Sequence, residues 1–150
     1  MLEDKLNQDL KAAMIAGDKS LVTTLRGLKS ALLYAKIAGQ VRDKVMPDSE
    51  VIAVLQKEAK KRQESADLYL QGGSHEKADA ELFEKRIIEQ YLPAQLSEEE
   101  VKKLVEDVAG ELGSVSQANM GQLIAAVRQR AGGAADGALI ARLVKERLTQ

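Results

Sequence analysis

One pattern runs through the sequence from end to end: apolar residues recur at intervals of three and four and are interrupted by glycine. In an α-helix this spacing places the apolar side chains on one face, whereas a half-buried strand requires strict alternation. The series Leu21, Leu25, Leu28 and Leu32 is an example, and Gly39 is a suitable helix stop after it. Strand-type alternation is not evident in any segment, so the sequence predicts an all-α fold.

The pattern and its stops predict seven helices. We expect them at residues 2–16, 20–38, 48–70, 75–91, 98–112, 117–130 and 137–148. Residues 40–46 read as a polar loop, and Pro47 suits the start of the third helix because a first turn tolerates proline. The break at Gly72-Gly73, followed by Ser74 as a candidate N-cap, predicts that the third and fourth helices form an antiparallel hairpin.

The clearest boundary in the chain is Leu92-Pro93. A residue before proline disfavours helical backbone angles, so the fourth helix is expected to end there. Ser97 and Glu100 then match a capping box, in which each side chain bonds the backbone N–H of the other residue. We therefore predict a four-helix N-terminal domain over residues 1–93 and a small three-helix bundle over residues 94–150.

Composition excludes several classes of functional site. The 150 residues include no cysteine and a single histidine, His75, so disulfides, thiolate metal sites and multi-histidine sites are not expected. Aromatic residues make up 3% of the chain and tryptophan is absent, which argues against a platform for stacking bases. The 22 basic and 23 acidic residues indicate a solvated helical surface. We expect no metal ion and no other cofactor.

The N-terminal residues and the apolar runs bear on localisation. Residues 1–5 are charged and lack the apolar core of a secretory signal. Apolar runs all fall well short of the roughly 20 residues that a membrane span requires. The sequence therefore predicts a cytoplasmic protein without a membrane-spanning segment.

Catalytic motifs are not found. The glycine-rich turn at residues 132–137 follows a helix and lacks the Lys-Ser/Thr ending of a phosphate-binding loop. It is better explained as a helix stop followed by Asp136 as the N-cap of the last helix. The acidic run Glu98 to Glu100 is explained by the positive end of a helix. We predict no catalytic residue.

Two groups of basic residues are candidates for contacts with nucleic-acid phosphates. The first group, on the third helix, is Lys57, Lys61 and Arg62. The second lies in residues 117–150, where five basic residues outnumber two acidic ones: Arg128, Arg130, Arg142, Lys145 and Arg147. Both groups also fit solvated helix faces whose cations favour helix C-termini, and the small surplus of basic residues favours this interpretation. The residues by themselves leave both interpretations open.

Stretches along nearly the whole chain carry a resemblance to a known family. They are Leu2–Asn7 with Asp9–Met14, Thr24–Ala31, Val54–Glu58 with Lys60–Arg62, Glu89–Ser97, and Met120-Gly121 with Ala135-Asp136-Gly137 and Leu143–Lys145. In this combination they resemble the GatB/YqeY family. The resemblance implies a four-helix N-terminal domain and a C-terminal domain similar to the tail of the B subunit of the glutamine-dependent tRNA amidotransferase.

The resemblance also implies a function. In the larger enzyme that tail helps to hold the acceptor tRNA, and family members are often described as carbon–nitrogen ligases with glutamine as amido-N-donor. The kinase-like cradle and the amidase of that enzyme have no counterpart in this sequence. We therefore expect an accessory protein, not catalytic by itself, that binds tRNA or works with the tRNA amidotransferase and other translation proteins. The alternative is a protein–protein adaptor with no nucleic-acid role.

Overall fold

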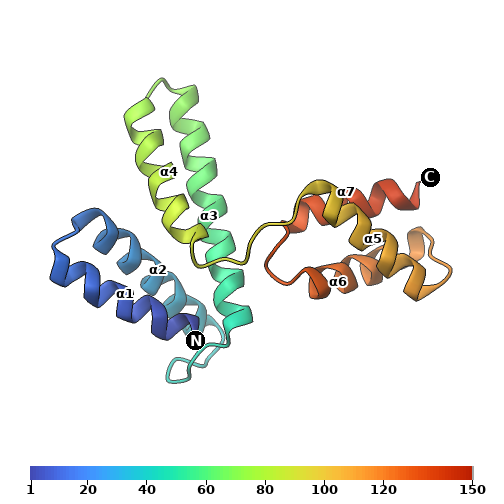
Figure 1. Ribbon diagram of the computed structural model, residues 1–150, viewed down its shortest axis with the longest axis horizontal. Coiled ribbons are helices and arrows are strands. Elements are labelled where there is room, and N and C mark those ends of the chain that lie inside the picture. Colours follow the sequence, from blue (N-terminus) through green and yellow to red (C-terminus); the bar gives the residue numbers. More distant parts are fainter. Residues whose placement is uncertain (150) are drawn as a thin grey trace. The chain divides into compact units, whose positions relative to one another are not determined.

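The computed structural model describes residues 1–149, and these are all-α, as the sequence predicted (Figure 1). The chain divides into two compact units, Met1–Leu92 and Pro93–Gln150. Gln150, the last residue of the predicted second domain, lies outside the described residues. The first unit contains α1 (Leu2–Ala16), α2 (Lys19–Ala38), α3 (Asp48–Gln71) and α4 (His75–Glu89). The second contains α5 (Glu98–Leu112), the 3₁₀ turn η1 (Gln117–Asn119), α6 (Met120–Ala131) and α7 (Gly137–Leu148).

The first unit is built from two helical hairpins, α1–α2 and α3–α4 (Figure 1). Leu6, Leu25 and Leu28 from the first hairpin share one buried core with Val51 and Leu55 from the N-terminal half of α3. Further along the second hairpin, Ala66 of α3 and Ala78 of α4 are both fully buried. Small side chains at these two positions let the helices approach closely.

The second unit packs three helices around its own core. Val105 of α5, Leu123 and Val127 of α6, and Ile140 and Val144 of α7 are all buried there. The segment before α5 is tied to the turn between α6 and α7, because the Leu96 N–H donates to the carbonyl of Ala134 at 2.7 Å. The backbone thus closes the bundle at the end where the chain enters it.

The fourth helix ends earlier than predicted, at Glu89 and not near Tyr91. The Tyr91 ring is buried in the core of the first unit, and its hydroxyl donates a hydrogen bond to Asp9 Oδ2 at 2.5 Å. That contact joins residues 82 positions apart, so helical spacing carries no sign of it. The tertiary contact and the approaching Pro93 together take Tyr91 out of the helix.

Two predicted N-caps are confirmed in position but lack a predicted or expected side-chain bond, and the start of the sixth helix differs from the prediction. Ser97 accepts from the Glu100 N–H at 3.1 Å, but the reverse bond of the capping box is not formed among the described residues. Ser74 is the N-cap of α4, yet its side chain forms no capping hydrogen bond. The predicted sixth helix begins as the turn η1, where the Ser116 N–H donates to Asn119 Oδ1 at 3.0 Å. Competing local bonds explain this start, because Asn side chains readily form turns.

One apolar residue of α1, Met14, is exposed although it follows Leu10 at helical spacing. Met14 is 51% exposed, whereas Leu6 and Ala13 are buried. At about 100° per residue, Met14 lies about 80° around the helix from Leu6 and so falls at the edge of the buried face.

The turn after α2 contains Gln40, the single non-glycine residue with positive φ among the described residues, at 58°. The next N–H, of Val41, donates to the Lys36 carbonyl at 2.9 Å, so Gln40 occupies the left-handed position of a helix C-terminal motif. Glycine usually takes this position because a Cβ raises the energy of left-handed backbone.

We expect Gln40→Gly to raise the free energy of unfolding by about 1 kcal/mol, because it removes this backbone strain. The greater entropy of glycine in the unfolded chain offsets part of the gain. Urea denaturation followed by circular dichroism measures the change. Gln40→Ala is the matched control, since it keeps the Cβ, and a Gln40→Gly variant no more stable than Gln40→Ala would contradict the expected net gain.

Candidate nucleic-acid interface

Three of the five basic residues predicted in the tail are held in ion pairs. Arg130 forms two hydrogen bonds to Glu111, at 2.8 and 2.5 Å. Arg142 donates to Glu98 at 2.5 Å and to Glu146 at 3.0 Å. The third pair joins Arg147 to Glu106, with 2.7 Å between Nε and Oε1.

These contacts tie α5 to α6 and α7 and neutralise charge on the surface. The hydrogen bonds that Arg130 donates to Glu111 raise the pKa of Arg130 above its usual value, and those that Arg142 donates to Glu98 and Glu146 do the same for the pKa of Arg142. A phosphate would have to compete with a carboxylate for each of these guanidinium groups.

Arg128 and Lys145 differ from the other three, because neither forms an ion pair within the part of the chain that the structure describes. Both are exposed. The Arg128 guanidinium lies against Gly137, the first residue of α7, where an added Cβ would be 3.6 Å from Nη2. Arg128 therefore adds a full positive charge at the positive end of a helix dipole. Asp136 caps the same end, accepting from the Ala138 N–H at 3.4 Å.

The predicted group on α3 does not form one surface. Lys57 and Lys61 are exposed, and Lys61 pairs with Glu58 at 3.3 Å. The Arg62 side chain is only 17% exposed. It donates from Nη1 to Glu58 at 2.6 Å and from Nε to Glu84 of α4 at 3.0 Å.

Arg62 also connects the second hairpin to the first. A Cβ on Gly27 of α2 would lie 3.7 Å from Arg62 Nη2, and Thr24 of α2 donates from Oγ1 to Glu84 at 3.4 Å. Burial lowers the pKa of Arg62, but the hydrogen bonds to Glu58 and Glu84 outweigh it and raise the pKa above its usual value. The arrangement gives this guanidinium a structural position between three helices.

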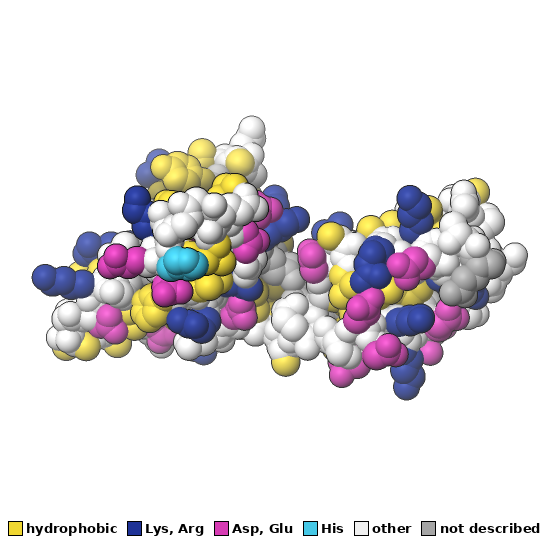
Figure 2. Space-filling model, turned by 90° about the horizontal axis from the view of Figure 1, so that it is seen from above, with side chains coloured by type: hydrophobic (Ala, Val, Ile, Leu, Met, Phe, Trp, Pro, Cys, Tyr) yellow, Lys and Arg dark blue, Asp and Glu magenta, His cyan; other side chains and the backbone are white. Residues whose placement is uncertain are grey.

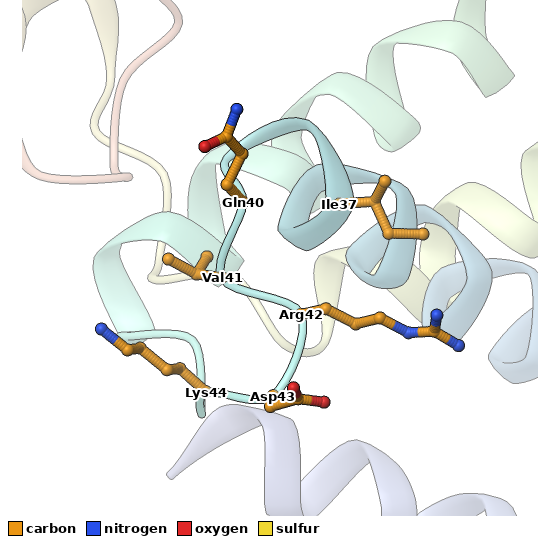
Figure 3. Close-up of a pocket in the computed structure, with 6 residues that line it drawn as sticks. All are labelled: Ile37, Gln40, Val41, Arg42, Asp43 and Lys44. Carbon is orange, nitrogen blue, oxygen red and sulfur yellow. The ribbon is translucent and has the colours of Figure 1, made fainter.

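The strongest concentration of positive charge was missed by the sequence analysis. Residues 19–44 contain six basic residues and one acidic residue, Asp43. The basic residues are Lys19, Arg26, Lys29, Lys36, Arg42 and Lys44. Lys36 forms an ion pair with Glu3. The loop after α2 borders a shallow hollow of about 370 Å³, and the side chains of Ile37 and Arg42 point to the same side of the chain there (Figure 3). A count of charges in a sliding window would have found this segment.

Two other kinds of feature are absent from residues 1–149. No group of three or more His, Cys, Asp or Glu side chains is arranged there to hold a metal ion. No helix in this range is long and apolar enough to span a membrane. The single histidine, His75, is exposed at the start of α4.

Comparison with known proteins identifies relatives of the chain. The sequence profile of the family described as "Yqey-like protein" matches residues 3–148. The protein "Altered inheritance of mitochondria protein 41, mitochondrial" of Eremothecium gossypii is 33% identical over 89 residues. That match covers 59% of this chain and 48% of the other protein, so the chain spans about half the length of this relative.

The contacts of Arg62 predict that this residue stabilises the fold, whereas its exposed neighbour Lys61 does not. We expect Arg62→Met to lower the free energy of unfolding by about 2 kcal/mol, because Glu58 and Glu84 lose their partner; a fully buried pair would cost roughly 3–5 kcal/mol. The neighbouring Lys61 side chain is 67% exposed, and Lys61→Met is expected to change stability by no more than about 0.5 kcal/mol. Urea denaturation compares the two, and equal effects would contradict the structural position of Arg62.

Proposed function

The chain belongs to the Yqey-like protein family, and from this premise we propose that it is a non-catalytic accessory protein that binds tRNA. The resemblance of residues 94–150 to the tail domain of the tRNA amidotransferase B subunit supports the proposal. On this proposal the protein presents tRNA to, or works beside, an amidating enzyme. The carbon–nitrogen ligase chemistry with which the family is described would then belong to that enzyme, and we assign no catalytic residue to this chain.

The observation that carries the proposal is the pair of exposed cations, Arg128 and Lys145, that no carboxylate neutralises among the described residues. Arg128 lies at the N-terminus of α7, where backbone N–H groups and the helix dipole favour an anion. Lys145 lies two turns further along the same helix. We propose these two side chains as the main phosphate contacts and expect smaller contributions from Arg130, Arg142 and Arg147.

The proposal places the protein in the cytoplasm with the cellular tRNA pool. The relative from Eremothecium gossypii is named as mitochondrial, so organellar tRNA is the second pool worth testing.

Retention of labelled tRNA on filters across a salt series tests the proposal. We expect a dissociation constant in the micromolar range at low salt that rises as salt is added, because phosphate contacts release counterions. The double variant Arg128→Ala/Lys145→Ala is expected to weaken binding and to reduce the salt slope by about two, roughly one for each cation removed. Lys102→Ala/Lys103→Ala is the matched control, since it removes two exposed cations from α5 of the same unit.

A second candidate function is favoured by the ion pairs of Arg130, Arg142 and Arg147, which occupy three of the five basic side chains proposed as phosphate contacts in the tail. It is a protein–protein adaptor with no nucleic-acid role. Absence of tRNA binding even at low salt would contradict the first proposal and favour the adaptor. The adaptor in turn requires a protein partner that stays bound to the full chain after nuclease treatment.

A further inference from the structure

The outward side of α2 carries a continuous row of exposed side chains. The opposite side of the helix contributes Leu25, Leu28 and Leu32 to the core of the first unit. At about 100° per residue, Ile37 lies about 180° around the helix from Leu28. The row follows at intervals of four and three residues, and each of its members is exposed: Lys19, Thr23, Arg26, Ser30, Leu33 and Ile37. These intervals keep side chains on one helix face, so the six residues form a single stripe about 27 Å long, which we call the α2 stripe.

The two halves of the α2 stripe differ in character. The first half holds two cations, Lys19 and Arg26, and neither forms an ion pair within the described part of the chain. In the second half, Leu33 is 41% and Ile37 is 48% exposed, and Tyr34 beside them is 72% exposed. The whole helix contains four basic residues and no acidic residue. The stripe is therefore positive along its first half and apolar along its second.

Two carboxylates near the start of the stripe already have partners. Asp18 caps α2 and accepts a hydrogen bond from the Leu21 N–H at 3.2 Å. Glu84 of α4 lines a hollow together with Lys19, but its carboxylate accepts from Arg62 Nε at 3.0 Å. The positive charge of the first half thus remains available to a partner.

We propose that the α2 stripe binds one amphipathic helix of a partner protein, acidic at one end and apolar at the other. Alternating intervals of three and four residues suit a second helix that lies lengthwise along the first, at a crossing angle of about 20°. Acidic side chains of the partner lie along Lys19 and Arg26. Its apolar side chains cover Leu33 and Ile37 and remove them from water. This surface belongs to the first unit, and it does not depend on the tRNA contacts proposed for the second.

Other ligands match only one half of the stripe. The phosphates of an RNA would neutralise Lys19 and Arg26 but leave Leu33 and Ile37 in water. A helix that lies on a lipid surface buries apolar side chains along its length. The large exposed apolar side chains of α2 are confined to its second half. A helix of mixed character therefore fits the stripe better than either ligand.

A different exposed apolar region of the first unit does not suit the same partner. At the start of α4, acidic (magenta) and hydrophobic (yellow) side chains border His75 (cyan) (Figure 2). Residues 74–84 hold four acidic residues and one basic residue. An acidic helix would be repelled there, because like charges that face each other are unfavourable.

Helical peptides of about 20 residues, long enough to span the stripe, test the proposal. Each peptide carries leucine at alternating intervals of three and four over one half, and either glutamate or lysine at the corresponding positions of the other half. Both orders of the two halves are synthesised, so that both directions of the partner helix are sampled. Fluorescence anisotropy with the full chain is expected to give a dissociation constant in the micromolar range for a glutamate peptide, and one at least about tenfold higher for its lysine counterpart.

Two double variants probe the two halves of the stripe separately. Lys19→Glu/Arg26→Glu is expected to reverse the preference, so that the lysine peptide binds more tightly than the glutamate peptide. Leu33→Ser/Ile37→Ser is expected to weaken the binding of the glutamate peptide by at least about tenfold, because the apolar contact is lost. All four side chains are exposed, and circular dichroism verifies that each variant keeps its helices.

Matched controls change exposed residues outside the stripe. Lys102→Glu/Lys103→Glu alters the net charge by the same amount on α5. Met14→Ser/Ile15→Ser removes two exposed apolar side chains from α1. Both variants are expected to bind the glutamate peptide as the unchanged protein does.

Several outcomes would overturn the proposal. Equal affinity for the glutamate and lysine peptides, or binding of neither, would contradict the charge complementarity. Binding to vesicles of phosphatidylserine and phosphatidylcholine that Leu33→Ser/Ile37→Ser abolishes would assign the stripe to a lipid surface. Loss of tRNA binding in Lys19→Glu/Arg26→Glu, which leaves Arg128 and Lys145 unchanged, would assign it to RNA.

Discussion

The arrangement of the first unit depends on one half-buried guanidinium. Arg62 projects from α3 and is held by Glu58 of its own helix and by Glu84 of α4, while Gly27 of α2 leaves room for it. A charge withdrawn from water requires close partners of opposite sign, so the three helices are stable only where those partners meet. Together with the apolar core that Leu25 and Leu28 share with Val51 and Leu55, this requirement orients the α3–α4 hairpin against α2.

Ion pairs have a different consequence in the second unit. Arg130, Arg142 and Arg147 lie at the surface, where a pair with a carboxylate contributes little to stability. Such pairs still occupy guanidinium donors that a phosphate would need. The second unit thus pairs three of its four arginines and leaves Arg128, like Lys145, unpaired among the described residues.

The candidate site was predictable from sequence in its residue types but not in its geometry. The count of basic residues in the tail identified Arg128 and Lys145 together with three arginines that carboxylates hold. Glu98 and Arg142 are 44 positions apart, so their contact depends on how α5 packs against α7. On α3, Lys61 and Arg62 are adjacent in sequence, but one is exposed and the other faces two helices. The basic segment over residues 19–44, in contrast, is visible in the sequence itself.

The sequence by itself determined the all-α class, the positions of most helices and the change of unit near Pro93. These properties depend on apolar spacing, glycine stops and proline geometry, which act within a few residues. Only the tertiary structure decided the end of α4, because the bond from Tyr91 to Asp9 joins distant parts of the chain. It also decided which cations are buried, paired or free, since a carboxylate from another helix reaches a guanidinium only after the helices have packed.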